Sequence, residues 1–99
     1  MFEIDFTPTS ARHVRNYRKF EQKVILDAIE QQLLYEPNVA TRNRKPLDEN
    51  NLANWELRVD RYRVFYDIII EDDRQIVKIK AIGHKQHNIL YIDKQEVQL

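Results

Sequence analysis

The segment from Trp55 to Ile82 constrains the fold most, because two short turns divide it into strands whose pairing can be worked out in advance. Apolar and polar residues alternate along it, which is typical of strands with one buried face. Asp60 and Arg61 predict a two-residue hairpin turn, since aspartate tolerates the left-handed backbone that such a turn needs. The acidic segment 71–74 predicts the next turn. The three expected strands span 54–59, 62–70 and 75–82.

The two turns also predict which residues face each other across the sheet. The first turn pairs Arg58 with Arg63, and the second pairs Phe65 with Lys80. Both registers gather apolar side chains on the same face, which supports a core on that side. The predicted apolar face comprises Trp55, Leu57, Val59, Tyr62, Val64, Tyr66, Ile68, Val77, Ile79 and Ala81. The predicted opposite face comprises Glu56, Arg58, Arg63, Phe65, Asp67, Lys78, Lys80 and Ile82.

The N-terminal half predicts one strand followed by two helices. Residues 2–6 alternate as a strand, and Thr7-Pro8 then suits a helix start, with Thr7 as the cap. The helices are expected over about 8–18 and 20–35, followed by a polar loop over 36–54. The second helix is expected to bury Phe20, Val24, Ala28, Ile29 and Leu33, which recur at helical spacing, with Leu26 and Leu34 widening the apolar face. The tail after residue 82 fits either a strand or a short helix. The prediction is therefore a single α+β domain over 1–99, of order β-α-α-β-β-β.

Composition excludes several classes of protein. Sixteen basic residues balance sixteen acidic ones, so no overall charge draws the chain to nucleic acid or membrane. Without cysteine there is neither a disulfide nor a thiolate metal site, and the histidines and carboxylates show no metal-ligand spacing. A single glycine excludes a glycine-rich phosphate loop. The N-terminus lacks the pattern of a signal peptide, so a cytoplasmic protein is expected.

The opposed arginines require something to offset their repulsion, because like charges at facing positions destabilise a strand pair. Glu56 and Asp67 offer one explanation, a solvated face of mixed charge. The other explanation is an external anion, since paired guanidinium groups bind phosphate well. Arg42, Arg44, Lys45, Lys80 and Lys85 would extend such a basic patch, and Phe65 would stack on a base. The residue pattern alone leaves both explanations open.

Two segments make the chain similar to a known superfamily. The run "RNRKPLDENNLANWELRVDRYRVFYDI" followed by "VKIKAIGHKQHNILYI" resembles the RelE/ParE superfamily of bacterial toxins, the toxin halves of type II toxin–antitoxin pairs. The resemblance covers the whole length and the element order. It implies a cytoplasmic protein neutralised by an antitoxin peptide that wraps the toxin, and it leaves both a homodimer and a toxin–antitoxin hetero-oligomer open.

The resemblance also implies a site. RelE-like members cut mRNA, usually on the ribosome, through attack of the ribose 2′-hydroxyl on the phosphate, without a metal or other cofactor. Arg63 falls on the phosphate-stabilising arginine of the family, and Glu56 stands where the RelE type has a lysine. Some nuclease relatives instead resemble a Glu-Arg-His arrangement, which Glu56, Arg63 and either His84 or His87 would supply. The candidate catalytic residues are Arg63, Arg58, Glu56, His84, Lys85, His87 and Tyr91, and the candidate RNA-binding residues are Arg42, Arg44, Lys45, Phe65 and Lys80.

Two alternatives to an mRNA endoribonuclease remain at this point. ParE-like members of the superfamily inhibit DNA gyrase and are not nucleases, and the exchange at Glu56 also admits a catalytically silent relative. Acid–base candidates between residues 84 and 91 favour a nuclease, whereas an empty basic face would favour a toxin that only binds.

Overall fold

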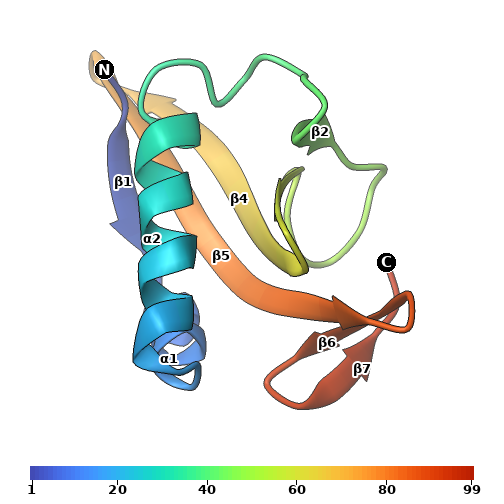
Figure 1. Ribbon diagram of the computed structural model, residues 1–99. Coiled ribbons are helices and arrows are strands. Elements are labelled where there is room, and N and C mark those ends of the chain that lie inside the picture. Colours follow the sequence, from blue (N-terminus) through green and yellow to red (C-terminus); the bar gives the residue numbers. More distant parts are fainter.

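The computed structural model describes all 99 residues and confirms an α+β fold (Figure 1). A short strand and two helices precede a curled, mostly antiparallel sheet. The elements are β1 (Glu3–Phe6), α1 (Pro8–Arg15), α2 (Lys19–Leu33), β2 (Arg44–Pro46), β3 (Trp55–Val59), β4 (Tyr62–Glu71), β5 (Arg74–Gln86), β6 (Ile89–Ile92) and β7 (Gln95–Val97). As predicted, Thr7 caps α1, since its hydroxyl oxygen accepts the backbone N–H of Ser10 at 3.0 Å.

The sheet is organised around β4 and β5, its two longest strands. The path runs β2-β3-β4-β5-β6-β7, and β1 joins in parallel along the same edge of β5 that β6 uses further on. The predicted register of the first hairpin is confirmed, with Arg58 opposite Arg63 and Asp60 in the left-handed conformation. The second turn is tighter than predicted, with Asp72 and Asp73 both left-handed, but it gives the same pairing of the strands beside it.

A β-bulge in β5 breaks the predicted register halfway along the second hairpin. Tyr66 faces Ile79 as expected, but Phe65 faces Ala81, so Lys80 is the extra residue. Every side chain beyond the bulge changes face. The prediction was therefore wrong for Ala81, which leaves the helix side, and for Ile82, which joins it.

Helix α1 is anchored where the bulge disturbs the ladder. The Ser10 hydroxyl donates to the carbonyl of Ile79 at 2.7 Å, and the backbone N–H of Ile82 donates to Nδ1 of His13 at 3.2 Å. Both side chains are buried. Two polar side chains of α1 thus satisfy backbone groups of β5 on either side of the bulge.

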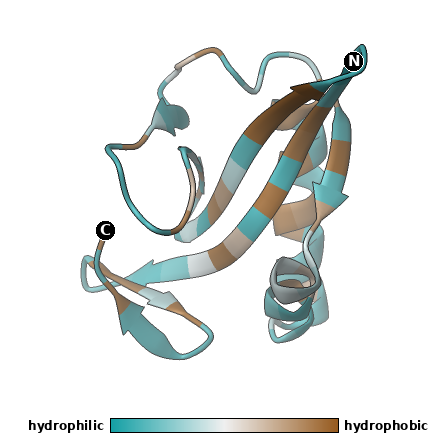
Figure 2. Cartoon of the chain, turned by 180° about the vertical axis from the view of Figure 1, so that it is seen from behind, coloured by the Kyte–Doolittle hydropathy of each residue, from teal (hydrophilic) through white to brown (hydrophobic).

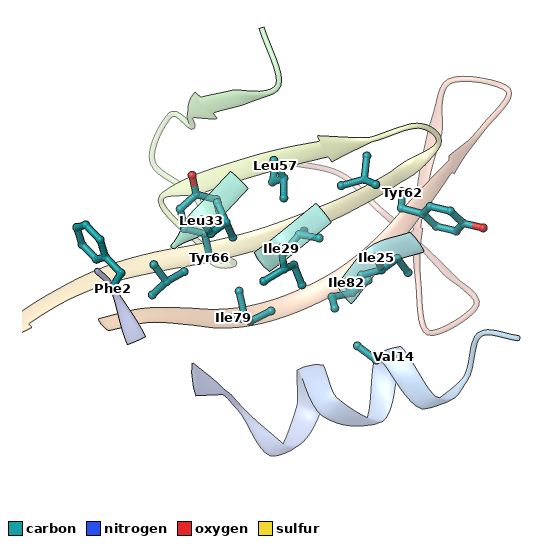
Figure 3. Close-up of a cluster of buried hydrophobic side chains, with 13 residues drawn as sticks. Phe2, Val14, Ile25, Ile29, Leu33, Leu57, Tyr62, Tyr66, Ile79 and Ile82 are labelled. Atoms are coloured by element: carbon teal, nitrogen blue, oxygen red, sulfur yellow. The ribbon is translucent and has the colours of Figure 1, made fainter. Parts of the chain in front are cut away.

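The main core lies between the helices and the sheet. Figure 2 shows hydrophobic and hydrophilic bands alternating along β4 and β5, and Figure 3 shows the side chains that this pattern gathers. Helix α2 contributes Ile25, Ile29 and Leu33, which differs from the predicted stripe: Phe20 and Val24 are exposed. Members of the cluster are Phe2, Val14, Ile25, Ile29, Leu33, Leu57, Val59, Tyr62, Val64, Tyr66, Val77, Ile79 and Ile82.

A second, smaller core lies on the opposite face of the sheet, under the tail hairpin β6–β7. It consists of Ala53, Phe65, Ala81, Leu90 and Ile92. The tail is therefore a strand pair rather than a helix. The hairpin packs so closely that a Cβ built on Gly83 would lie 2.4 Å from the carbonyl oxygen of Tyr91. That contact explains why the single glycine of the chain stands at this position.

Candidate functional site

The face of the sheet away from the helices brings together four of the predicted catalytic residues, Glu56, Arg58, Arg63 and Lys85. Glu56 and Arg63 lie on neighbouring strands, and Lys85 comes two residues after Gly83, which is the β5 partner of Arg63. Alternation along β5 therefore places Lys85 on the same face. Arg58 faces Arg63 across the ladder and is exposed.

Arg63 is buried, although its proposed contact with a phosphate led us to expect an accessible guanidinium. Only 8% of the residue is exposed. Its Nη1 donates to the carbonyls of Asp60 and Tyr62, both at 2.8 Å, and its Nε lies 3.7 Å from Oε1 of Glu56 without a hydrogen-bond partner. Burial and the facing Arg58 lower the pKa of Arg63, while the Glu56 carboxylate acts in the other direction. Glu56 and Arg63 thus form a desolvated ion pair in which the Nε–H of Arg63 has no hydrogen-bond partner.

Glu56 also lines a cavity of about 680 Å³ between the tail hairpin and the loop that precedes β3. Lys45 reaches it because β2 pairs Lys45 with Glu56. The lining consists of Lys45, Leu47, Asp48, Glu49, Asn50, Glu56, Lys85, Asn88, Ile89, Leu90, Glu96, Val97, Gln98 and Leu99. Arg63 is not part of this lining and contacts the cavity only through Glu56.

His84 and Tyr91 lie on the other side of the sheet, so the structure does not bring them together with Arg63. They face each other across β5 and β6 with stacked rings, 5.7 Å between centroids. Nδ1 of His84 lies 2.7 Å from the hydroxyl of Tyr17, next to α2. Burial lowers the pKa of His84 and raises that of Tyr17 to about 12. His87 is exposed in the left-handed turn between β5 and β6.

Two of the predicted RNA-binding residues, Phe65 and Arg44, are buried and contact only the protein itself. Phe65 is fully buried in the second core, so its ring offers no face to a base. Arg44 is buried because β2 pairs it with Leu57 on the helix side. Its guanidinium donates to the carbonyls of Val39 and Gln32, at 3.0 and 2.7 Å, and so ties the polar loop to the end of α2.

The other basic candidates are spread over the surface. Arg42 and Lys45 are exposed in the loop region, and Lys80, the bulged residue, is half-buried with its Nζ 3.9 Å from Oδ2 of Asp67. Of these, only Lys45 lines the cavity. These residues therefore do not form one continuous basic patch, which was one of the two explanations for the opposed arginines.

Sequence reasoning missed a buried polar network at the start of α2. Glu21 is 7% exposed, and its Oε2 accepts the hydroxyl of Tyr62 at 2.5 Å and Nη2 of Arg61 at 2.8 Å. The hydrogen bond from Tyr62 is the largest of the effects that lower the pKa of Glu21. A carboxylate three residues after a helix start, in the position typical of a capping box, was the available signal. It does not reveal the partners from the distant turn.

No group of three or more histidine, cysteine, aspartate or glutamate side chains is arranged to hold a metal ion. Neither helix combines the length and hydrophobicity that a bilayer crossing requires.

Comparison with known proteins places this geometry in a family. Residues 4–89 match the model of the ParE toxin of the type II toxin–antitoxin system parDE. Among solved structures, the RelBE2 toxin–antitoxin complex from Mycobacterium tuberculosis contains a similar chain, with a TM-score of 0.69 and 24% identity over 85% of this chain and 98% of that one. A search of curated proteins found no match. The structural likeness supports the RelE-like fold, and the family match, which spans most of the sequence, shows that the chain belongs to the ParE toxins of type II toxin–antitoxin systems.

Proposed function

We propose that this toxin is an endoribonuclease whose site consists of Glu56 and Lys85 in the cavity wall and of Arg63 behind Glu56. The observation that carries the proposal is the buried Glu56–Arg63 contact at 3.7 Å, with an unpartnered donor beside a cavity of about 680 Å³. Buried ion pairs contribute little net stability compared with apolar residues of the same size. A desolvated pair next to a cavity is therefore better explained by chemistry than by folding.

Each residue has a distinct role in the proposed reaction. Glu56 accepts the proton of a ribose 2′-hydroxyl, whose oxygen forms a bond to phosphorus while the bond from phosphorus to the 5′-oxygen breaks. Lys85 supplies positive charge at the phosphate and a proton to the departing 5′-oxygen. Arg63 orients the Glu56 carboxylate and adds charge behind it. The products are a 2′,3′-cyclic phosphate and a 5′-hydroxyl.

The decisive variant is Glu56→Gln, which keeps the shape of the side chain and removes the base. Toxin recovered from its antitoxin complex is incubated with a synthetic RNA, and separately with translated mRNA, with a chelator present throughout. Cut sites are mapped by primer extension. We expect cleavage to fall by about 100-fold or more, in line with the usual contribution of a general base. Glu30→Gln, an exposed change on α2, is the matched control. Unchanged cleavage by Glu56→Gln contradicts the assignment.

A second function has one observation in its favour. Four carboxylates, from Asp48, Glu49, Glu56 and Glu96, line the cavity against two ammonium groups, from Lys45 and Lys85. Such a lining suits a basic protein surface better than a phosphate chain. The alternative is therefore a toxin that binds DNA gyrase without cleaving RNA. Growth arrest with intact mRNA, together with inhibition of gyrase supercoiling by wild-type toxin, would establish it.

We also infer a cognate antitoxin whose peptide covers this cavity. The family is defined by toxin–antitoxin pairs, and the structural neighbour was solved as such a complex. The carboxylates at the rim favour a segment with basic side chains. Co-expression with the adjacent reading frame should give a stable complex, and Glu49→Lys should weaken it more than Glu30→Lys does. Equal effects of the two changes would argue against this surface.

A further inference from the structure

The turn between β3 and β4 supports two of the three residues of the proposed site. Nη1 of Arg63 donates to the carbonyls of Asp60 and Tyr62, both at 2.8 Å. The backbone N–H of Lys85 donates to the carbonyl of Arg61 at 2.7 Å. Three successive carbonyls of this turn therefore fix the guanidinium of Arg63 and the backbone that carries Lys85.

The same turn is held from the other side of the sheet by Glu21. Its Oε2 accepts from Nη2 of Arg61 at 2.8 Å and from the hydroxyl of Tyr62 at 2.5 Å. Its Oε1 accepts the backbone N–H of Arg18 at 3.1 Å, which fixes the carboxylate to the start of α2. Figure 3 shows Tyr62 at one end of the core cluster, with its hydroxyl oxygen pointing away from the other labelled side chains.

The arginine in this network is also held by its neighbour's ring. The guanidinium carbon of Arg61 lies 5.0 Å from the ring centroid of Tyr62, a cation–π distance. Tyr62 in turn packs edge-on against Tyr17, with 5.6 Å between the centroids. The two donors to Glu21, Arg61 and Tyr62, therefore have restricted positions. The carboxylate of Glu21 can thus hold the turn in place.

From this chain of contacts we propose that Glu21 is a positioning residue for the proposed site, acting through the turn at residues 60–62. The inference deepens the proposed function and relies on it for its kinetic readout. Glu21 lies on the helix side of the sheet and lines no cavity that contains Glu56 or Lys85. Its effect on the site therefore passes through the carbonyls of Asp60, Arg61 and Tyr62. Displacement of catalytic groups by about 1 Å is enough to cost on the order of 100-fold in rate.

The test compares Glu21→Ala with Tyr66→Phe, which removes a buried hydrogen bond from the Tyr66 hydroxyl to the carbonyl of Pro37 and leaves the turn at residues 60–62 untouched. Both variants are expected to lose stability, so all measurements are made well below both melting temperatures. We expect Glu21→Ala to lower kcat for RNA cleavage by about tenfold to 100-fold with little change in KM. Tyr66→Phe should stay within about twofold of wild type, because it removes none of the contacts to Arg63 and Lys85. Glu21→Gln, which retains an acceptor for Tyr62, should recover part of kcat.

A second readout does not depend on enzymatic activity. Amide hydrogen exchange of Lys85 reports its bond to the carbonyl of Arg61, and the Nε–H resonance of Arg63 reports the guanidinium. In Glu21→Ala we expect the Lys85 amide to exchange roughly tenfold faster relative to that of Val77, and the Arg63 resonance to shift. The inference is overturned if both signals and kcat match those of Tyr66→Phe. If wild-type toxin cleaves no RNA, the proposed function fails, while these two signals still decide whether Glu21 holds the turn.

Discussion

Replacing Gly83 by alanine tests how closely the tail hairpin packs on the sheet. A Cβ at this position would lie 2.4 Å from the carbonyl oxygen of Tyr91, 2.7 Å from Cγ1 of Ile92 and 3.3 Å from Cδ1 of Leu90. Ordinary non-bonded contacts between carbon atoms begin at about 3.5 Å. Strand β6 must therefore move by about 1 Å, and the first obstacle is backbone, which cannot rotate out of the way.

The expected cost follows from two contributions. Overpacking of this kind typically costs about 1–3 kcal/mol. Leu90 and Ile92 are 6% and 8% exposed, and each is worth about 1.5–3 kcal/mol when fully buried, so partial loss adds about 2 kcal/mol. We expect Gly83→Ala to lower the free energy of unfolding by roughly 3 kcal/mol or more. For a domain of this size that corresponds to a fall in Tm of about 12–24 °C.

Urea unfolding followed by circular dichroism measures this change, with a thermal scan as a second estimate. Gln86→Ala is the control, since Gln86 is exposed on the same strand. It should change stability by less than about 0.5 kcal/mol. Without the close approach, alanine would be favoured over glycine in a strand by roughly 0.5–1 kcal/mol. A neutral or stabilising result for Gly83→Ala would therefore refute the described packing of the hairpin.

Three further predictions concern buried polar groups. Arg63→Met should destabilise the toxin by about 3 kcal/mol because it leaves the Glu56 carboxylate buried without its partner, and adding Glu56→Leu should restore most of the loss in urea unfolding; additive losses would contradict this. Arg44→Ala should cost roughly 2 kcal/mol through its hydrogen bonds to the loop and to α2, and limited proteolysis should then cut the loop faster than in wild type. Burial lowers the pKa of His13, so just below pH 6.5 the unfolded chain binds more protons than the folded protein does. The stabilising contribution should therefore be complete above that pH and be lost as the pH falls. His13→Gln should make the free energy of unfolding depend less steeply on pH, and the dependence that remains should come from His84, whose pKa is lowered in the same direction. A slope unchanged by His13→Gln would show that His13 does not titrate with unfolding.

The local signals in the sequence predicted the hairpins well, because a turn length and an alternating pattern each fix the same register. These signals failed at Lys80. The bulge there contains neither glycine nor proline, and the alternating pattern continues through it. Because of that single extra residue, the prediction assigned Ala81 and Ile82 to the wrong faces of the sheet. The bulge is stabilised by Ser10 and His13 of α1, which are distant in sequence, so no local pattern reveals it.

The site was predicted in part for the same reason. Strand alternation placed Glu56 and Arg63 on one face, and the structure agrees. Lys85 joined the candidates through family resemblance, and it lies on that face only because the bulge shifts the register of β5. His84 was grouped with them through family resemblance, but its position beyond the bulge turns it toward Tyr17. The burial of Arg63 was not predicted, because the second core under the tail hairpin depends on a strand pair that the sequence left undecided.

The pairing of β1 with β5 has a consequence for how the toxin is made. Four consecutive hairpins join β3 through β7. Strand β1, in contrast, has no partner in the sheet until Ile76, which pairs with Glu3, has been synthesised. At typical synthesis rates of about 5–20 residues per second, that interval lasts roughly 4–15 s on the ribosome. Until then α1 lacks the strand that it packs against, and closing so long a loop is a slow, late step. The nascent chain thus acquires its core only near the end of synthesis, and a product truncated before β5 is expected to remain unfolded and harmless.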